Sequence, residues 1–76
     1  MEIILYSKPN CSACKRTKLL LQALDVSYEE RDVLENESYM TEAKATGLSA
    51  MPIILAGEEI LSGFQPAKLQ ELIGSL

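Results

Sequence analysis

The order of its apolar segments is the feature that most constrains the fold of this chain. Short apolar runs, broken by prolines, glycines and asparagines, predict strands and helices in a definite succession. The expected elements are a strand at 2–7, a helix at 11–24, a strand at 27–33, a helix between Asn36 and Gly47, strands at 52–55 and 59–61, and a helix from Pro66. A strand–helix–strand unit pairs its strands in parallel through a right-handed crossover, and a hairpin adds antiparallel strands. The sequence therefore predicts an α/β protein, one domain over residues 1–76, with a mixed four-stranded sheet and helices on both faces.

Apolar spacing also predicts which side chains are buried. The unbroken run Ile3-Ile4-Leu5-Tyr6 is typical of a central strand that is covered on both faces, whereas the charged residues 28–32 fit an edge strand. The inward stripes of the three helices are expected to hold, in order, Thr17, Leu20, Leu21 and Leu24; then Tyr39, Met40 and Ala43; then Leu69, Leu72, Ile73 and Leu76. Asn36 is the expected N-cap of the second helix, and Gly47 its C-terminal glycine, followed by an apolar contact of Leu48.

Charge and composition exclude several classes of function. Seven basic and eleven acidic residues give a net charge of −4, which argues against nucleic acid as a partner. The absence of histidine removes the commonest general base and metal ligand. No apolar run is long enough to span a membrane, and Met1-Glu2 lacks the basic flank of a signal peptide. We therefore expect a cytoplasmic protein without membrane contact, and we expect it to be a monomer.

The two cysteines lie in different environments of the expected first helix. The helical register places Cys14 on the buried stripe and Cys11 at the first turn. At that turn, backbone N–H groups without helical partners and the positive end of the helix dipole favour a thiolate. A structural disulfide between the two would close a very small loop and constrain the unfolded chain little.

This asymmetry suits thiol–disulfide exchange. Cys11 would attack a target disulfide, and Cys14 would resolve the mixed disulfide. Lys8 and Lys15 add positive charge near the attacking sulfur. Other interpretations remain open: two buried structural thiols, or a zinc site or iron–sulfur cluster bridging two chains, because one chain supplies only two thiolates. Redox exchange is the interpretation that the spacing favours.

Pro52 opens the third predicted strand, where a residue without an N–H group belongs at an end or an edge. In the predicted topology this point lies beside the start of the first helix. A cis Met51–Pro52 bond there would present the Met51 backbone to an extended substrate segment. The alternative is that Pro52 only begins a strand.

The element order, Cys-Ser-Ala-Cys at the start of the first helix and Met51-Pro52 before the third strand resemble the thioredoxin fold in its short glutaredoxin form (βαβαββα). Residues 52–57 and the segment Ser-Gly-Phe-Gln-Pro at 62–66 are similar to the NrdH-type redoxins. That resemblance implies a small dithiol–disulfide oxidoreductase that thioredoxin reductase reduces. It would donate electrons to a class Ib ribonucleotide reductase or to other protein disulfides. It implies no bound cofactor or metal, with NADPH acting only through the reductase.

The resemblance also assigns roles to residues. Cys11 matches the nucleophile and Cys14 the resolving thiol of a redox-active Cys11–Cys14 disulfide, and Pro52 matches the cis-proline. Contacts with a substrate or partner are implied for Lys8, Ser12, Ala13, Met51, Ser62, Gly63 and Phe64. For the segment 62–64, a plain strand-to-helix turn with Phe64 in the core is an equally good interpretation.

A glutathione-dependent glutaredoxin is the alternative within the same fold. The resemblance to glutaredoxins assigns an acidic or hydroxyl pair after the fourth strand to the charged end of glutathione, and Phe64-Gln65 offers neither. The chain also departs from the usual redoxin pattern at Gln65, where arginine is common, at Leu61, where tryptophan is common, and at Met51, where valine or alanine is common.

Overall fold

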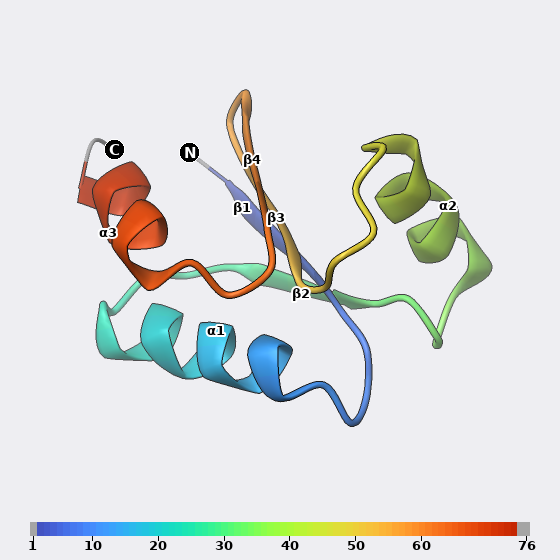
Figure 1. Cartoon of the computed structure of the whole chain (residues 1–76), viewed down its shortest axis with the longest axis horizontal. Helices are drawn as coiled ribbons and strands as arrows, with labels where there is room; N and C mark the ends of the chain where they lie inside the picture. Colours follow the sequence, from blue (N-terminus) through green and yellow to red (C-terminus); the bar gives the residue numbers. More distant parts are fainter. Residues whose placement is uncertain (1, 75–76) are drawn as a thin grey trace.

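The computed structural model describes residues 2–74 and has the expected order of elements (Figure 1). These are β1 (Ile3–Ser7), α1 (Ser12–Ala23), β2 (Glu29–Asp32), α2 (Glu37–Ala45), β3 (Ile53–Ala56), β4 (Glu59–Ser62) and α3 (Pro66–Gly74). The strands form one sheet in the order β2-β1-β3-β4. β1 pairs in parallel with β2 and antiparallel with β3, which pairs antiparallel with β4. The predicted mixed sheet, with the apolar strand in the middle and the charged strand at an edge, is confirmed.

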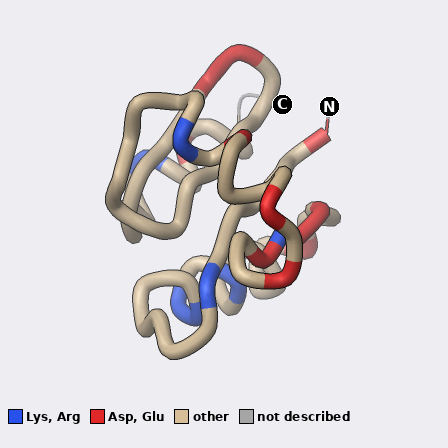
Figure 2. Tube along the Cα trace, turned by 90° about the vertical axis from the view of Figure 1, so that its right-hand side faces the viewer, with Lys and Arg blue, Asp and Glu red and all other residues tan. Residues whose placement is uncertain are grey.

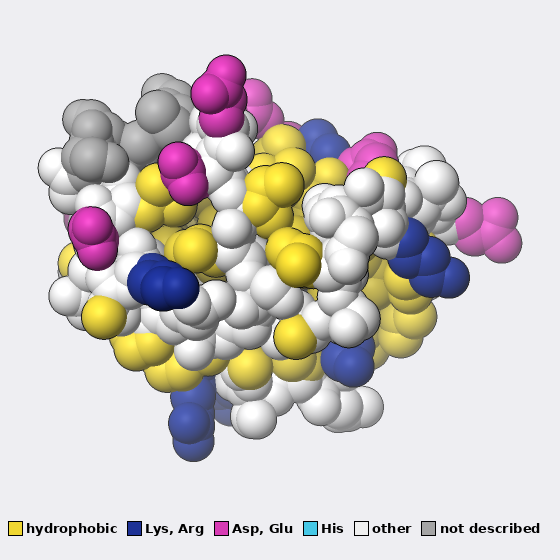
Figure 3. All heavy atoms as spheres, turned by 45° about the horizontal axis from the view of Figure 1, so that its top comes forward, with side chains coloured by type: hydrophobic (Ala, Val, Ile, Leu, Met, Phe, Trp, Pro, Cys, Tyr) yellow, Lys and Arg dark blue, Asp and Glu magenta, His cyan; other side chains and the backbone are white. Residues whose placement is uncertain are grey.

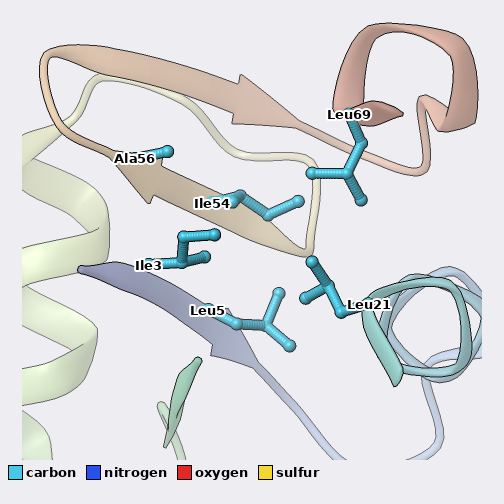
Figure 4. Packing of buried hydrophobic residues seen from close by; sticks show 6 residues of the cluster. All are labelled: Ile3, Leu5, Leu21, Ile54, Ala56 and Leu69. Carbon is cyan, nitrogen blue, oxygen red and sulfur yellow. The ribbon is translucent and has the colours of Figure 1, made fainter. Parts of the chain in front are cut away.

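Helices cover both faces of the sheet, with α1 and α3 on one side and α2 on the other (Figure 1). On the first face, side chains from β1 and β3 meet Leu21 of α1 and Leu69 of α3 (Figure 4). The members of this cluster are Ile3, Leu5, Leu21, Ile54, Ala56 and Leu69. Because successive strand residues point to opposite faces, Tyr6 and Ile53 face α2, where they pack with Val33 and Ala43.

Polar contacts also hold α2 on the sheet. The hydroxyl of Tyr6 donates to Oε1 of Glu42 at 2.8 Å, and Nη1 of Arg31 donates to the same oxygen at 2.6 Å. The Arg31 guanidinium also lies 5.8 Å from the ring centroid of Tyr6 and 5.6 Å from that of Tyr39. Asn36 caps α2 as expected, since its side chain accepts the N–H of Ser38 at 2.9 Å.

Several elements begin or end one or two residues away from the predicted boundaries. The first strand begins at Ile3, and the second covers only Glu29–Asp32. Pro52 precedes β3, and Ala56 belongs to that strand, where it pairs with Glu59. The hairpin turn is therefore only the two residues 57–58, with Gly57 at φ +62°, as two-residue hairpins require of their first position.

Two side chains expected in the core are exposed. α1 ends at Ala23, and Leu24 is its C-cap with 37% of its surface exposed. Leu48 is 38% exposed, and its N–H donates to Oγ1 of Thr46 at 3.2 Å. The other predicted stripe residues within 2–74 are buried or half-buried, and Leu76 lies outside the described residues.

No helix in the described part of the chain is long and apolar enough to cross a membrane. Some large hydrophobic side chains are exposed, among them Leu19 on α1, Leu34 after β2 and Ile60 on β4. Figure 3, in which the top of Figure 1 comes forward, shows hydrophobic side chains in several groups between polar and charged ones.

Candidate active site

Both cysteines lie at the N-terminus of α1, as the sequence predicted. Cys11 is the N-cap, with extended backbone angles, and its Sγ accepts the N–H of Cys14 at 3.2 Å. Its thiol thus occupies the place that a serine or aspartate oxygen takes at most helix starts. Cys11 is half-buried and Cys14 only 1% exposed, and both are free thiols. The accessible sulfur therefore lies where a backbone donor can stabilise negative charge.

The thiol of Cys14, the expected resolving residue, is held protonated. Burial raises the pKa of Cys14 to about 11, and its hydrogen bond with the Cys11 side chain acts in the same direction. A hydrogen bond with the Lys8 backbone and the charge of Lys18 oppose this rise and lower the pKa. Cys14 is therefore a poor nucleophile at neutral pH until its surroundings change, whereas Cys11 can react first.

Lys18 was not among the site residues expected from the sequence, but it lies close enough to Cys14 for its charge to lower the pKa of that thiol. Its Nζ lies 2.9 Å from Oε2 of Glu30 on β2, and the buried hydroxyl of Ser7 donates to the same oxygen at 2.8 Å. The lysine lowers the pKa of Glu30, and the carboxylate raises that of Lys18. A spacing of four residues from Cys14, which puts both on one helix face, was the available signal.

The Met51–Pro52 peptide bond is cis. The end of β4 and the residue after it are hydrogen-bonded to the same loop. The N–H of Gly63 donates to the carbonyl of Pro52 at 2.9 Å, and the hydroxyl of Ser62 donates to the carbonyl of Ala50 at 2.7 Å. Gly63 has φ +77°, a conformation that glycine adopts without steric cost. Ser62 and Gly63 thus help to hold the cis-proline loop in place through these two hydrogen bonds.

Phe64 and Gln65 complete this turn. Phe64 is half-buried and belongs to neither buried cluster, so it is not a core residue. The amide Nε2 of Gln65 donates to the carbonyl of Ser62 at 2.6 Å, and the Gln65 carbonyl accepts the N–H of Leu69 at 2.9 Å. The side-chain amide of Gln65 is therefore hydrogen-bonded within the turn.

Both cysteines line one hollow, and a second hollow shares Lys8 with it. The thiol hollow, about 650 Å³, is lined by Lys8, Pro9, Asn10, Cys11, Ser12, Cys14, Lys15 and Lys18. The α2 hollow, about 240 Å³, has a mainly apolar lining with two lysines: Lys8, Val33, Met40, Ala43, Lys44, Leu48, Ser49, Met51 and Ile53. Lys8 lines both, so the two hollows meet at this residue.

The hollows contain three of the seven predicted partner-binding residues: Lys8 and Ser12 line the thiol hollow, and Met51 and Lys8 line the α2 hollow. The other four, Ala13, Ser62, Gly63 and Phe64, line neither. The carbonyl of Ala13 accepts the hydroxyl of Thr17 at 2.8 Å. Lys44 was missed, because nothing near it in the sequence connects it to the cysteines.

Comparisons with family models, protein sequences and solved structures all find similarity to glutaredoxin-like proteins. A family model described as Glutaredoxin matches residues 3–61. The glutaredoxin-like protein NrdH of Lactococcus lactis subsp. lactis is 30% identical over 70 residues, which cover 92% of this chain and 97% of that protein. The solved structure of the NrdH-redoxin of Escherichia coli, a glutaredoxin-like protein with a thioredoxin-like activity profile, aligns with a TM-score of 0.89 and 26% identity over 95% of each chain. Methanoredoxin of Methanosarcina acetivorans aligns with a TM-score of 0.81 and 29% identity, over 96% of this chain and 84% of that one.

Proposed function

This chain belongs to the glutaredoxin family and is an NrdH-type redoxin, and on that premise we propose that it carries electrons from thioredoxin reductase to protein disulfides, a class Ib ribonucleotide reductase among them. The observation that carries the proposal is the N-cap position of Cys11, accessible and bonded to the N–H of the buried Cys14. The same proposal assigns it to the cytosol, where thiols are kept reduced.

The reaction consists of two exchanges. The Cys11 thiolate attacks one sulfur of the target disulfide, so that a Cys11–target disulfide forms and the other target sulfur leaves as a thiolate. Cys14 then loses its proton and attacks Sγ of Cys11, which releases the second target thiolate. The target gains two electrons, and the redoxin is left with a Cys11–Cys14 disulfide. The dithiol of a reductase restores the two thiols by the same exchanges in reverse.

A protein donor is favoured over glutathione by the turn after β4. Glutathione carries carboxylates and an ammonium group, and Lys8 offers a partner only for a carboxylate. Phe64 has no polar group, and the Gln65 amide is bonded to Ser62. An ammonium group left unpaired at a partly desolvated site would lower affinity. The thioredoxin-like activity profile of the Escherichia coli relative supports the same choice.

NADPH oxidation in two coupled assays, with the same target disulfide, tests the donor. We expect rapid turnover with thioredoxin reductase and weak turnover with glutathione and glutathione reductase. The Cys11→Ser variant is the control and should be inactive in both. If glutathione supports turnover and thioredoxin reductases from several sources do not, the chain is a glutathione-dependent glutaredoxin.

A further inference from the structure

Four of the five lysines of this acidic chain line the two hollows. Lys8 and Lys15 line the thiol hollow with Lys18, and Lys8 and Lys44 line the α2 hollow. No aspartate or glutamate in the described part of the chain lines either hollow. Figure 2 shows basic segments gathered low in the view, where β1 leads into α1, whereas the topmost turn, between β3 and β4, is acidic.

Three of these lysines keep their charge available for a partner. Lys18 is paired with Glu30, but Lys8, Lys15 and Lys44 are exposed and make no ion pair with any other residue of 2–74. Arg31, by contrast, is paired with Glu29 and Glu42. The unpaired positive charge therefore extends from the start of α1 to the end of α2.

We propose that the targets of this redoxin carry their disulfide on an acidic segment, which lies across the thiol hollow and the α2 hollow and pairs with Lys8, Lys15 and Lys44. The inference rests on the proposed function and names the chemistry of its target. An extended segment whose cystine reaches Cys11 would place the residues on either side of it near Lys15 and Lys44, with Lys8 between.

The net charge of −4 repels an acidic target, whereas the lysines at the hollows attract it. The ionic strength decides which of these two effects is larger, because it sets the distance over which charges act. The molecule measures 31 × 25 × 18 Å. At 0.01 M ionic strength the Debye length is about 30 Å, so an approaching acidic segment experiences the whole acidic chain. At about 0.1 M it falls to about 10 Å, and the nearby lysines dominate. At 1 M it is about 3 Å, and even their effect is largely screened.

Single-turnover reduction of two peptides tests the inference without any reductase. Both have the same length and intramolecular disulfide, and their flanking residues are aspartate and glutamate in one and lysine in the other. The reduced redoxin is mixed with each peptide at 0.1 M and 1 M ionic strength. We expect the acidic peptide to be reduced about tenfold faster at 0.1 M, the low end of electrostatic rate effects, and less than about twofold faster at 1 M.

Charge reversals locate the effect. Lys15→Glu and Lys44→Glu should each lower the acidic-to-basic rate ratio by about threefold or more. Lys68→Glu is the matched control, because it changes the net charge equally but lies beside Leu61, Glu71 and Leu72, away from both hollows. The acidic-to-basic rate ratio of Lys68→Glu should equal that of the unmodified protein.

Equal rates for the two peptides, or a preference for the basic one, would overturn the inference and leave the proposed function standing. An equal loss of preference in Lys68→Glu would also overturn it, since net charge alone would then explain the selectivity. If the reduced protein reduces neither peptide, nor insulin disulfides, the proposed function fails and the inference with it.

Discussion

Cys11 and Cys14 are separated by one helical turn and yet differ in burial, hydrogen bonding and protonation. The N-cap position exposes Cys11, whereas the helix directs Cys14 against the sheet, where it loses contact with water. Desolvation is the main reason that the pKa of Cys14 is raised to about 11. The order of the two exchange steps follows from this difference.

The Cys14→Ser variant should stop the reaction at the mixed disulfide. Mixed with a disulfide peptide, it should accumulate a covalent adduct on Cys11, visible by mass spectrometry. In the Cys11→Ser variant, Cys14 should react with iodoacetamide at pH 7 at least about tenfold more slowly than Cys11 does in Cys14→Ser, because it is buried and protonated. The two rates should converge in denaturant. Faster alkylation of Cys14 in the folded protein would contradict the assignment of roles.

Gly63 is one of three glycines with a positive φ, the others being Gly47 and Gly57, and a side chain there is expected to be costly. Its φ of +77° is unfavourable for other residues, although a Cβ there would meet no atom within 4 Å. Gly63→Ala should therefore lower the free energy of unfolding by about 1–2 kcal/mol through backbone strain alone. Gly74→Ala, equally open but at the end of α3 without a positive φ, should leave stability unchanged or slightly higher. Urea unfolding measures both, and equal stability of the Gly63 variant and the unmodified protein would refute the argument.

At the scale of elements, one polar contact joins α1, β1 and β2 beneath the cysteines. Glu30 of β2 accepts hydrogen bonds from Lys18 of α1 and Ser7 of β1. Because Lys18 lies in the middle of α1, these bonds help to fix the helix on the sheet. The two charged side chains are 31% and 39% exposed, so the contribution is that of a surface pair, about 0.2–1 kcal/mol.

This contribution should depend on pH. Lys18 holds the pKa of Glu30 below its ordinary value of about 4.3, so the pair stabilises the folded state above that value and loses its effect as the pH falls through the lower folded-state pKa. Glu30→Gln should be less stable than the unmodified protein at pH 7, and the difference should shrink toward zero as the pH is lowered below about 4. Glu35→Gln, at an exposed site with no ion pair among residues 2–74, is the control. A difference in unfolding free energy between Glu30→Gln and the unmodified protein that is the same at pH 7 and pH 3 would contradict the role of the ion pair.

At the scale of the whole molecule, the large exposed hydrophobic side chains come from several different elements and loops. Leu19, Leu34 and Ile60 belong to different segments, and a stable dimer interface needs about 1,000 Å² of contiguous buried surface. Within residues 2–74 no group of three or more His, Cys, Asp or Glu side chains is arranged to hold a metal ion. A bridged zinc or iron–sulfur site would therefore need two chains.

We expect a colourless monomer of 8.4 kDa after purification without oxygen. Light scattering gives the mass, the visible absorption spectrum shows whether a cluster is bound, and metal analysis detects zinc. A brown protein of twice that mass would identify the iron–sulfur scaffold instead, and a colourless dimer with one zinc per two chains would identify the metal-bridged alternative.

The sequence by itself determined the elements, their order, the central and edge places of the first two strands, and the different positions of Cys11 and Cys14. These features depend on local signals: apolar periodicity, the Asn36 cap, the hairpin turn at Gly57 and the register of one helix. A helical register fixes which residues share a face without reference to the rest of the chain, so the placement of the two thiols could be predicted from their spacing.

Only the tertiary structure decided what surrounds the thiols. The pairing of Lys18 with Glu30, the bond from Gly63 to Pro52 and the place of Lys44 in a hollow with Lys8 join segments that are distant in sequence. The same holds for Leu24 and Leu48, whose exposure depends on where the helices end against the sheet. Periodicity identifies the inward face of an element, but the packing of one element on another determines which side chains on that face meet and which remain in water.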